Sequence, residues 1–328
     1  MVVWNCIINQ NGKLISTPSS AEETTASRAV ALGFFDGVHL GHQRIFRTMQ
    51  EVAQQEGLRT AVQTFQSPPA SKEQNNLITT YAERCRLISH MKIDDLFALP
   101  FDDRVKNMTP EAFMEVCIRD WMRTKAVVVG CDYRFGLGRA GDVKLLRKWG
   151  NKNGIRVITV DPVEHEGRRI SSSWVRELIA SGDVEKAEQL LGHPAVFSGV
   201  VEVGQQLGRK LGFPTANIRV SEQKMIPKFG VYASAYVYQD RIYPSITNIG
   251  MRPTVNKEGG SPLTETMLFD QHIPLYGTFG TVLLLDFIRP EQEFGSLEEL
   301  KTQMQSDQDT VRKYHQCRQI PVRFEGYV

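Results

Sequence analysis

The sequence lacks any run of apolar residues long enough to cross a membrane. A spanning helix needs about 20 consecutive apolar residues, and no stretch of the 328 residues approaches that length. The amino terminus also lacks the basic region that precedes the apolar core of a signal peptide. We therefore expect a cytoplasmic protein that binds no membrane.

The sequence also lacks an excess of either charge. Its 39 lysine and arginine residues stand against 37 aspartate and glutamate residues, and the formal net charge is +2. A protein that binds nucleic acid through a broad basic surface carries a larger excess. We therefore expect no nucleic-acid partner, although a local group of basic side chains can still bind a small anion.

Cysteine is scarce, and low-complexity linkers and internal repeats are absent. The number of cysteines is five, and no two of them form a Cys-x-x-Cys pair. An odd count without such a pair favours free thiols in a reducing cytosol over disulfides. The cysteines are Cys6, Cys85, Cys117, Cys131 and Cys317.

The first half of the chain alternates short apolar segments with segments of helical spacing. This alternation is typical of a parallel sheet with helices on both faces. The clearest helix start is Thr109-Pro110-Glu111, because threonine caps a helix well and proline suits its first position. The predicted strands are residues 28–34, 58–65, 96–100, 125–130 and 155–160.

The second half of the chain follows a different pattern from about residue 195 onward. Glycine and proline punctuate a series of short strands, which indicates a small antiparallel barrel. A capping box at residues 296–299 begins a closing helix, and a second helical stretch is expected over residues 309–318. The predicted strands are residues 196–203, 231–238, 241–249, 264–268 and 281–288.

Two short helices are expected between these halves, over residues 172–181 and 183–191. Gly182 suits the left-handed end of the first helix, and Asp183 suits the N-cap of the second. We therefore predict an α/β domain over residues 1–186, with a doubly wound parallel sheet, and a mainly β domain over residues 187–328.

The ten residues from Gly33 to His42, GFFDGVHLGH, form the most informative motif. They link a predicted strand to the start of a predicted helix, where free backbone N–H groups and the helix dipole favour phosphate. His39 and His42 share one face of the first turn, and the dipole disfavours their protonation. Gly41 lets a phosphate approach the backbone. A metal pair or two surface histidines are the alternatives, and the whole string favours phosphate.

Two further segments of the first half combine polar groups with turns. Asp132 follows a predicted strand and suits a ribose hydroxyl, with Phe135 near a ring. Taken alone, however, this segment is better explained as an ordinary glycine-rich turn. Residues 168–176, RRISSSWVR, place serines at a helix start between arginines, a composition that binds phosphate. A serine N-cap alone would not explain the arginines on both sides.

In the second half, the string from Gly204 to Asn217 combines three glycines and two cations beside a strand. Thr215 and Asn217 offer neutral oxygen atoms, which Mg²⁺ prefers and commonly shares with substrate phosphates. A basic β-turn is the alternative for residues 208–210. Glu265 lies on the same side of its strand as two apolar residues, which indicates an acid at a barrel mouth or a functional acid. A solvent-facing strand acid is an equal alternative.

The three segments of the first half, in this order, resemble the adenylyltransferase domain of the bacterial bifunctional riboflavin kinase/FAD synthetase family. The resemblance implies a nucleotidyltransferase domain that joins AMP to FMN and releases pyrophosphate, with His39 and His42 as catalytic residues on the ATP phosphates. The ATP-binding set that it implies is Gly33, Phe35, Asp36, Gly37, His39, Gly41, His42, Asp132, Arg169, Ser172, Ser173 and Arg176.

The second half resembles the riboflavin kinase domain of the same family. The resemblance implies a six-stranded barrel in which Thr215 and Asn217 bind MgATP and Glu265 is the general base on the ribityl hydroxyl. The expected cofactors are therefore ATP as co-substrate and Mg²⁺ as metal, with no tightly bound prosthetic group. The implied ATP- and flavin-binding residues are Gly208, Arg209, Gly212, Pro214, Thr215, Asn217, Asn248 and Arg289.

The chain departs from the family pattern at Ser67-Pro68, where relatives usually carry Pro-His. This departure leaves open the alternative that only the kinase works. A flavin- or nucleotide-binding regulator without turnover and an adenylyltransferase for another acceptor are further alternatives. Relatives also often carry histidine at the position of Met267, a change that removes no evident chemical role. The expected partners are riboflavin, FMN, FAD and ATP, and we expect a monomer or a weak homo-oligomer.

Overall fold

The computed structural model describes residues 1–8, 14–18, 25–68, 76–202, 215–239, 241–251, 262–269 and 273–318. The chain forms two compact units. The first comprises Met1–Gln74 and Arg84–Ser171, and the second comprises Asn75–Glu83 and Ser172–Val328. The boundary that the sequence predicts, between residues 186 and 187, stays a prediction.

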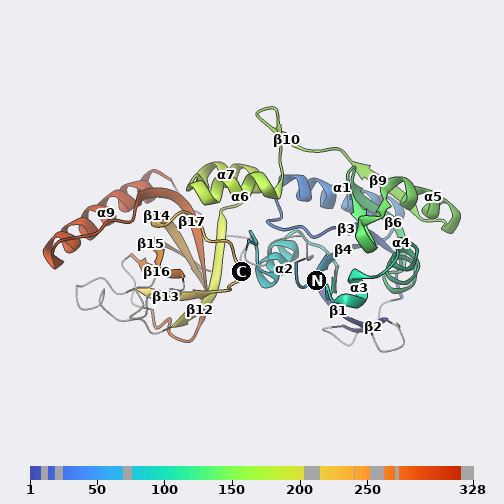
Figure 1. Cartoon of the computed structure of the whole chain (residues 1–328), viewed down its shortest axis with the longest axis horizontal. Coiled ribbons are helices and arrows are strands. Elements are labelled where there is room, and N and C mark those ends of the chain that lie inside the picture. The colour runs from blue at the N-terminus through green and yellow to red at the C-terminus, as the bar shows by residue number, and fades with distance from the viewer. Residues whose placement is uncertain are drawn as a thin grey trace. The chain divides into compact units, whose positions relative to one another are not determined.

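The first unit is built on one largely parallel sheet (Figure 1). Its strand order is β2-β1-β5-β4-β3-β6-β9, and all pairs are parallel except β1 with β2. Strands β3, β4, β5 and β6 are fully or largely buried, as continuous apolar strands of a covered parallel sheet should be. The strands are β1 (Val2–Ile8), β2 (Leu14–Pro18), β3 (Arg28–Leu32), β4 (Arg59–Phe65), β5 (Asp95–Leu99), β6 (Thr124–Gly130) and β9 (Arg156–Val160).

Amphipathic helices cover this sheet. Helix α1 (Leu40–Glu56) packs against β3 and β6 through a buried stripe of five apolar residues at helical spacing. Thr109 caps the predicted helix start, with its hydroxyl accepting a hydrogen bond from the Ala112 amide at 3.2 Å. This helix, however, begins as α4 (Pro110–Ala112) and continues as a π-helix, η1 (Phe113–Trp121). The others are α2 (Tyr81–His90), α3 (Asp103–Lys106), η2 (Leu137–Arg139) and α5 (Val143–Asn153).

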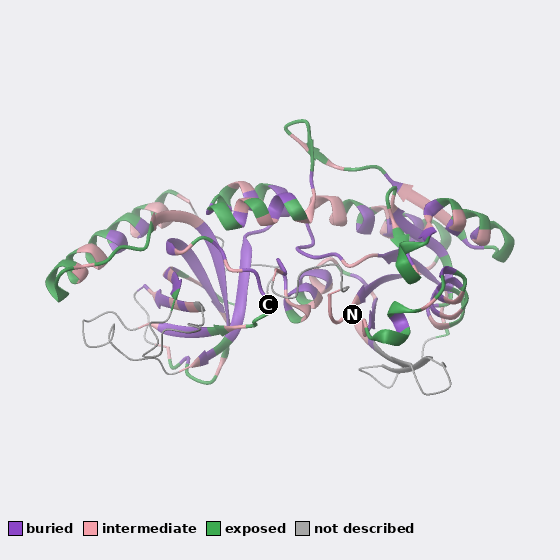
Figure 2. Cartoon of the chain, in the orientation of Figure 1, coloured by how far each residue is buried: buried purple, intermediate pink, exposed green. Residues whose placement is uncertain are grey.

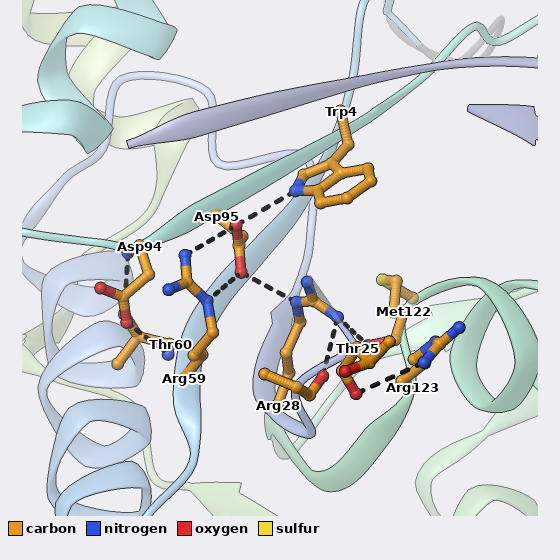
Figure 3. A network of polar contacts seen from close by, with 10 residues as sticks. Trp4, Thr25, Arg28, Arg59, Thr60, Asp94, Asp95, Met122 and Arg123 are labelled. Carbon is orange, nitrogen blue, oxygen red and sulfur yellow. Dashed lines mark hydrogen bonds and ion pairs between the residues drawn. The ribbon is translucent and has the colours of Figure 1, made fainter. Parts of the chain in front are cut away.

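A buried charge network lies at the amino ends of three parallel strands (Figure 3). The Asp95 carboxylate accepts hydrogen bonds from Arg28 at 2.8 Å, from Arg59 at 3.0 and 3.1 Å, and from the Trp4 indole at 3.1 Å. The side chains of Asp95 and Arg28 are 0% and 2% exposed. Because ligands of parallel sheets bind at the opposite, carboxyl ends, this network serves stability.

The second unit contains a closed antiparallel barrel of six strands, as predicted. The strand order is β12-β13-β16-β15-β14-β17. Serine and threonine hydroxyls fill part of its interior, where Thr247 lies 2.7 Å from Ser234 and 2.9 Å from Thr266. The strands are β12 (Ala195–Glu202), β13 (Ala216–Val220), β14 (Gly230–Tyr238), β15 (Arg241–Met251), β16 (Pro262–Leu268) and β17 (Phe279–Pro290).

Helices α6 (Ser172–Ser181), α7 (Val184–Leu191) and α9 (Leu297–Cys317) accompany the barrel in the described part of the second unit. Helices α6 and α7 lie where the sequence predicts them, with Gly182 at φ 88° and Asp183 capping α7. At the carboxyl end the prediction of two helical stretches is wrong, because α9 is one continuous helix capped by Ser296. Its Val311 packs on Met267 and Ala233 of the barrel.

The nine residues Asn75–Glu83 belong to the second unit although the first unit flanks them in the sequence. Leu77 forms a parallel bridge with Lys224. The Glu83 carboxylate accepts hydrogen bonds from the Lys224 ammonium at 2.7 Å and from the Ser198 amide at 2.8 Å. The side chains of Lys224 and Glu83 are each 1% exposed, so this is a fully buried ion pair.

The remaining strands form short two-stranded pairs. They are β7 (Arg134–Phe135) with β8 (Gly141–Asp142), and β10 (Glu164–His165) with β11 (Arg168–Arg169). Figure 2 shows that burial is concentrated in the long strands and on one side of each helix. Among the described residues no helix has the length and apolar character needed to cross a membrane.

Candidate active sites

The motif from Gly33 to His42 forms the junction between β3 and α1. Phe35, Gly37 and Val38 all have positive φ angles, of 56°, 81° and 43°. Two of these residues are not glycine, and such backbone strain is common at functional sites because the surroundings must hold it in place. The centre of the junction, residues 35–39, is buried, including Phe35 (3% exposed) and Asp36 (1% exposed).

The two histidines of this junction lie against each other. Their rings are stacked, with centroids 3.6 Å apart and an interplanar angle of 18°. His39 is the N-cap of α1, and its Nδ1 accepts a hydrogen bond from the His42 amide at 3.4 Å. The edge of Phe35 packs on His42 with the ring centroids 5.2 Å apart. Two imidazoles are thus fixed at a helix N-terminus, where the dipole favours negative charge.

Two glycines of the motif are required by close packing. A Cβ atom on Gly33 would lie 2.7 Å from the Phe35 ring, and one on Gly41 would lie 3.0 Å from the His39 ring. Gly41 therefore leaves space for the His39 ring. This is a second reason for glycine here, in addition to the predicted close approach of a phosphate to the backbone. The Ile170 carbonyl lies 3.9 Å from the same position, so the chain that follows β11 passes beside this junction.

Asp132 and Arg169 are brought together at the same end of the sheet. The Arg169 guanidinium donates a hydrogen bond to the Asp132 carboxylate at 2.7 Å, and both side chains are at least half exposed. Asp132 follows β6, whose last residue, Gly130, lies near Asp132 and near Ile45 of α1. The structure therefore gathers the histidine pair, Asp132 and Arg169 at the carboxyl ends of β3 and β6.

The serine–arginine motif is divided in the chain between the two units, because Arg169 belongs to the first unit and Ser172, Ser173 and Arg176 belong to the second. Ser172 begins α6, Ser173 is exposed, and Arg176 donates from its Nε to the Asn76 carbonyl at 2.7 Å. Asn76 belongs to the segment that the buried Glu83 anchors. The predicted contact of Arg176 with phosphate stays a prediction.

Two positions of the first half need comment. Phe135 is 6% exposed and packs on Phe113 and Tyr133, and its place near a bound ring stays a prediction. Ser67 and Pro68 follow β4 directly and are half-buried. The preceding Thr64 donates from its hydroxyl to the Phe34 carbonyl at 2.9 Å, so the end of β4 lies beside the histidine junction.

Four polar residues that the sequence predicts for the kinase site form a row across the barrel strands. Residues directly opposite each other in antiparallel strands project from the same face of a sheet. Asn217 pairs with Glu265, and Glu265 pairs with Asn248. The register continues from Asn248 through Val231 to Arg289. We call Asn217, Glu265, Asn248 and Arg289 the polar row.

The polar row lies on the outer face of the barrel. Met267, which alternates with Glu265 on the same strand, packs on Val311 of α9. Thr266, which lies between them in the sequence, faces the barrel interior, because its hydroxyl forms a hydrogen bond with the interior hydroxyl of Thr247. Glu265 is half-buried. A carboxylate held between two amides on this face suits proton removal from a bound hydroxyl.

Asn217 carries the feature that fits a metal ion. It is 6% exposed, and its Oδ1 atom is buried without a hydrogen-bond partner in the described part of the chain. A buried carbonyl oxygen without a partner is costly, and an oxygen-binding cation would satisfy it. Thr215 is half-buried two residues earlier. The residues present therefore fit Mg²⁺.

Arg289 is held by a helix instead of standing open. Its guanidinium makes a two-pronged ion pair with Asp307 of α9, at 2.7 to 3.1 Å. Gln303 donates to the same carboxylate at 2.8 Å. The predicted role of Arg289 in binding ligand stays a prediction, and the structure gives it a second role in fixing α9 to the barrel.

Some of the predicted site residues lie outside the described part of the chain. Two residues near the polar row were not predicted. Gly208, Arg209, Gly212 and Pro214 lie outside the described residues. Sequence reasoning missed Asp307 and Glu202. Asp307 is one acid among several in a polar helix, and Glu202 stands at the end of a strand, so no local pattern indicates that either lies beside the polar row. Only the strand register reveals that Glu202 is a neighbour of the row, because it pairs Glu202 with Asn217.

Comparison with known proteins decides the family. The model of the FAD synthetase family matches residues 21–174, and that of the riboflavin kinase family matches residues 191–315. The bifunctional riboflavin kinase/FMN adenylyltransferase of Escherichia coli strain K12 is 37% identical over 290 residues, which cover 87% of this chain and 92% of that protein. The chain belongs to this family.

Two more comparisons agree with that family in sequence and fold. The Listeria monocytogenes bifunctional riboflavin kinase/FMN adenylyltransferase is 33% identical over 298 residues, covering 89% of this chain and 94% of that protein. A crystal structure described as a macrolide-efflux protein from Streptococcus pneumoniae is 30% identical and superposes with a TM-score of 0.81, covering 95% of this chain and 99% of that one. From the latter we take the fold alone.

Proposed function

We propose that this protein is a two-step transferase that converts riboflavin to FMN and FMN to FAD. The observation that carries the proposal is that both family models match one chain, each over a segment that holds one of the two sites. The bifunctional relatives match along nearly their whole length. A kinase without adenylyltransfer is therefore not favoured, and neither is a regulator without turnover.

In the first reaction, the ribityl hydroxyl of riboflavin attacks the γ-phosphorus of ATP, and ADP leaves. Glu265 takes the hydroxyl proton as the new P–O bond forms. Asn217 and Thr215 would hold Mg²⁺, which when bound neutralises charge on the transferring phosphates. Asn248 on the other side of Glu265 orients the carboxylate or the flavin chain. The unpartnered Asn217 Oδ1 supports this assignment.

In the second reaction, a phosphate oxygen of FMN attacks the α-phosphorus of ATP, and pyrophosphate leaves. The reacting phosphate gains negative charge on its oxygens, and fixed donors aimed at those oxygens lower the barrier. The stacked His39 and His42 at the start of α1 supply such donors. Asp132 and Arg169 would bind the nucleotide, and Ser172, Ser173 and Arg176 the phosphates.

We further propose a cytoplasmic enzyme that acts as a monomer or a weak homo-oligomer on small molecules alone. The near balance of charges supports the absence of a nucleic-acid partner.

The test is to incubate the purified protein with riboflavin, ATP and Mg²⁺ and to separate the flavins by chromatography. We expect FMN first and FAD afterwards. Pyrophosphate release from FMN and ATP is measured separately. If FMN forms but no pyrophosphate is released, the protein is a kinase alone, and if no flavin product forms the proposal is wrong.

A further inference from the structure

We propose that Glu202 is a cation-binding residue of the kinase site, extending the polar row by one strand. The inference deepens the proposed kinase activity and rests on it. Neither the family motif nor the resemblance assigns a role to this residue. Its position follows from the barrel register, which pairs Glu202 of β12 with Asn217 of β13.

The strand register places two acidic residues on either side of Asn217, whose Oδ1 is buried. Glu202 and Glu265 are the two cross-strand neighbours of Asn217. Side chains at directly opposite positions have Cβ atoms about 4.5 to 5.5 Å apart and project from the same face. The Asn217 side chain is almost fully buried, and its Oδ1 has no hydrogen-bond partner among the described residues. Three oxygen-bearing side chains thus follow one another across three strands.

The chemistry of this set favours a hard divalent cation. Mg²⁺ and Mn²⁺ prefer carboxylate and amide oxygens. A site of Thr215 and Asn217 alone would be neutral, and Glu202 supplies a negative charge beside it. The Glu202 side chain is 40% exposed, so water and a cation can both reach its carboxylate.

Arg219 forms an ion pair with the Glu202 carboxylate and so affects its availability to a cation. Its guanidinium donates to Glu202 Oε1 at 3.2 Å, and the side chains are 74% and 40% exposed. An exposed pair of this kind contributes little to stability, so its main effect is on the charge that a cation would meet. Arg219 therefore competes with the cation for one carboxylate, and the two residues should have opposite effects on cation affinity.

The test is a titration of the whole protein with Mn²⁺ in the presence of ADP, with free Mn²⁺ measured by electron paramagnetic resonance. We expect Glu202→Gln to raise the Kd for Mn²⁺ on the order of tenfold, as removal of a supporting metal-site residue commonly does. We expect Arg219→Gln to lower it. Glu222→Gln removes an exposed acid of the same unit outside the row, and this control should leave the Kd unchanged.

The outcomes separate this inference from the function on which it rests. FMN formation by the unmodified protein tests the kinase activity alone. If FMN forms but Glu202→Gln leaves the Kd for Mn²⁺ within twofold, or if Arg219→Gln raises it, the inference is wrong. It is also wrong if the unmodified protein binds no Mn²⁺ with ADP present. A supporting result includes a raised KM for Mg²⁺ in Glu202→Gln, with kcat retained at saturating Mg²⁺.

Discussion

At the scale of single residues, the proposed general base of the kinase reaction and the histidine pair proposed for adenylyltransfer lie in different compact units. Glu265 stands between Asn217 and Asn248 in the barrel, whereas His39 and His42 stack at the start of α1. Substitutions therefore separate the reactions from each other and from loss of folding.

Glu265→Gln should abolish FMN formation and leave FAD formation from supplied FMN largely intact. Glutamine keeps the shape of the side chain but cannot take a proton, and a general base contributes on the order of 10² to 10⁴ in rate. The measurement is kcat for FMN formation beside the rate of pyrophosphate release from FMN. Loss of both rates would contradict two separate sites.

His42→Ala should have the reverse effect, lowering adenylyltransfer by about 10²- to 10³-fold, or 2–4 kcal/mol of barrier, as loss of one fixed donor does. FMN formation should be unchanged. His39→Asn is a matched variant, because asparagine still caps a helix well while the imidazole is lost. A His39→Asn protein with normal stability and normal adenylyltransfer would exclude His39 from the reaction.

At the scale of elements, two buried ion networks hold strands and segments in place. One joins the amino ends of β3, β4 and β5 through Asp95, and the other joins segment Asn75–Glu83 to the barrel through Lys224. Removing one partner of a buried ion pair strongly lowers the free energy of unfolding, because it leaves the other charge buried without a partner. Replacing both partners by apolar residues changes that free energy much less. Both networks therefore predict large effects of single substitutions.

Glu83→Gln should lower the free energy of unfolding by about 3–5 kcal/mol, since Lys224 is left charged and buried. The double variant Glu83→Gln with Lys224→Met should recover part of that loss. The measurement is the urea midpoint. Glu56→Gln is the control, because the Glu56–Arg156 pair is exposed and should contribute at most about 1 kcal/mol. Equal losses for Glu83→Gln and Glu56→Gln would refute the buried pair's importance.

The Asp95 network predicts a pH dependence of stability. Burial by itself raises the pKa of Asp95, but hydrogen bonds from Arg59, Arg28 and Trp4 outweigh it and bring the pKa below 3.8. A carboxyl group with a depressed pKa contributes its full stabilisation at pH values above the ordinary carboxyl pKa. This contribution is lost as the pH falls through the pKa of the folded state. The free energy of unfolding of the unmodified protein should therefore fall steeply below about pH 4.

The matched variant for this pH dependence is Asp95→Asn. It should be less stable at pH 7 and should show a shallower decline of stability below pH 4, measured by urea unfolding at a series of pH values. An acid decline of equal steepness in both proteins would assign the decline to other carboxylates.

The sequence predicts much of the fold at this scale, and the reasons for its failures are local. Strands β3 to β6 and β9 are predictable because they are short apolar segments between helices. Strand β13 was not predicted, because Ala216–Val220 follows directly on a motif of polar and glycine residues. The prediction of two terminal helical stretches failed because α9 is polar along most of its length and buries only three described residues fully.

The candidate sites were predictable only as motifs. The histidine pair and the start of α1 follow from local sequence, since a capped helix after a glycine turn is a short-range feature. The polar row does not, because the barrel order places β16 between β13 and β15. The neighbours of Asn217 are thus 15 residues earlier and 48 residues later in the chain (217 − 202 and 265 − 217).

At the scale of the whole molecule, the two reactions are linked by FMN, the product of one and the substrate of the other. If FMN leaves the kinase site before it is adenylylated, a mixture of Glu265→Gln and His42→Ala proteins should convert riboflavin to FAD after a lag, although neither variant does so alone. The lag should shorten as the His42→Ala protein is increased. A mixture that makes FMN without FAD, while the Glu265→Gln protein still uses supplied FMN, would contradict this prediction.

The placement of Asn75–Glu83 has a practical consequence for anyone who wishes to dissect this enzyme. A gene fragment that begins after Ser171 encodes the barrel and its helices but omits the nine residues that neutralise Lys224. In such a fragment the Lys224 ammonium would lack its carboxylate partner, and the backbone groups of Gln223 and Met225 would lose their hydrogen bonds to Leu77. A soluble stand-alone kinase would need that short peptide restored, either supplied in trans or grafted ahead of α6.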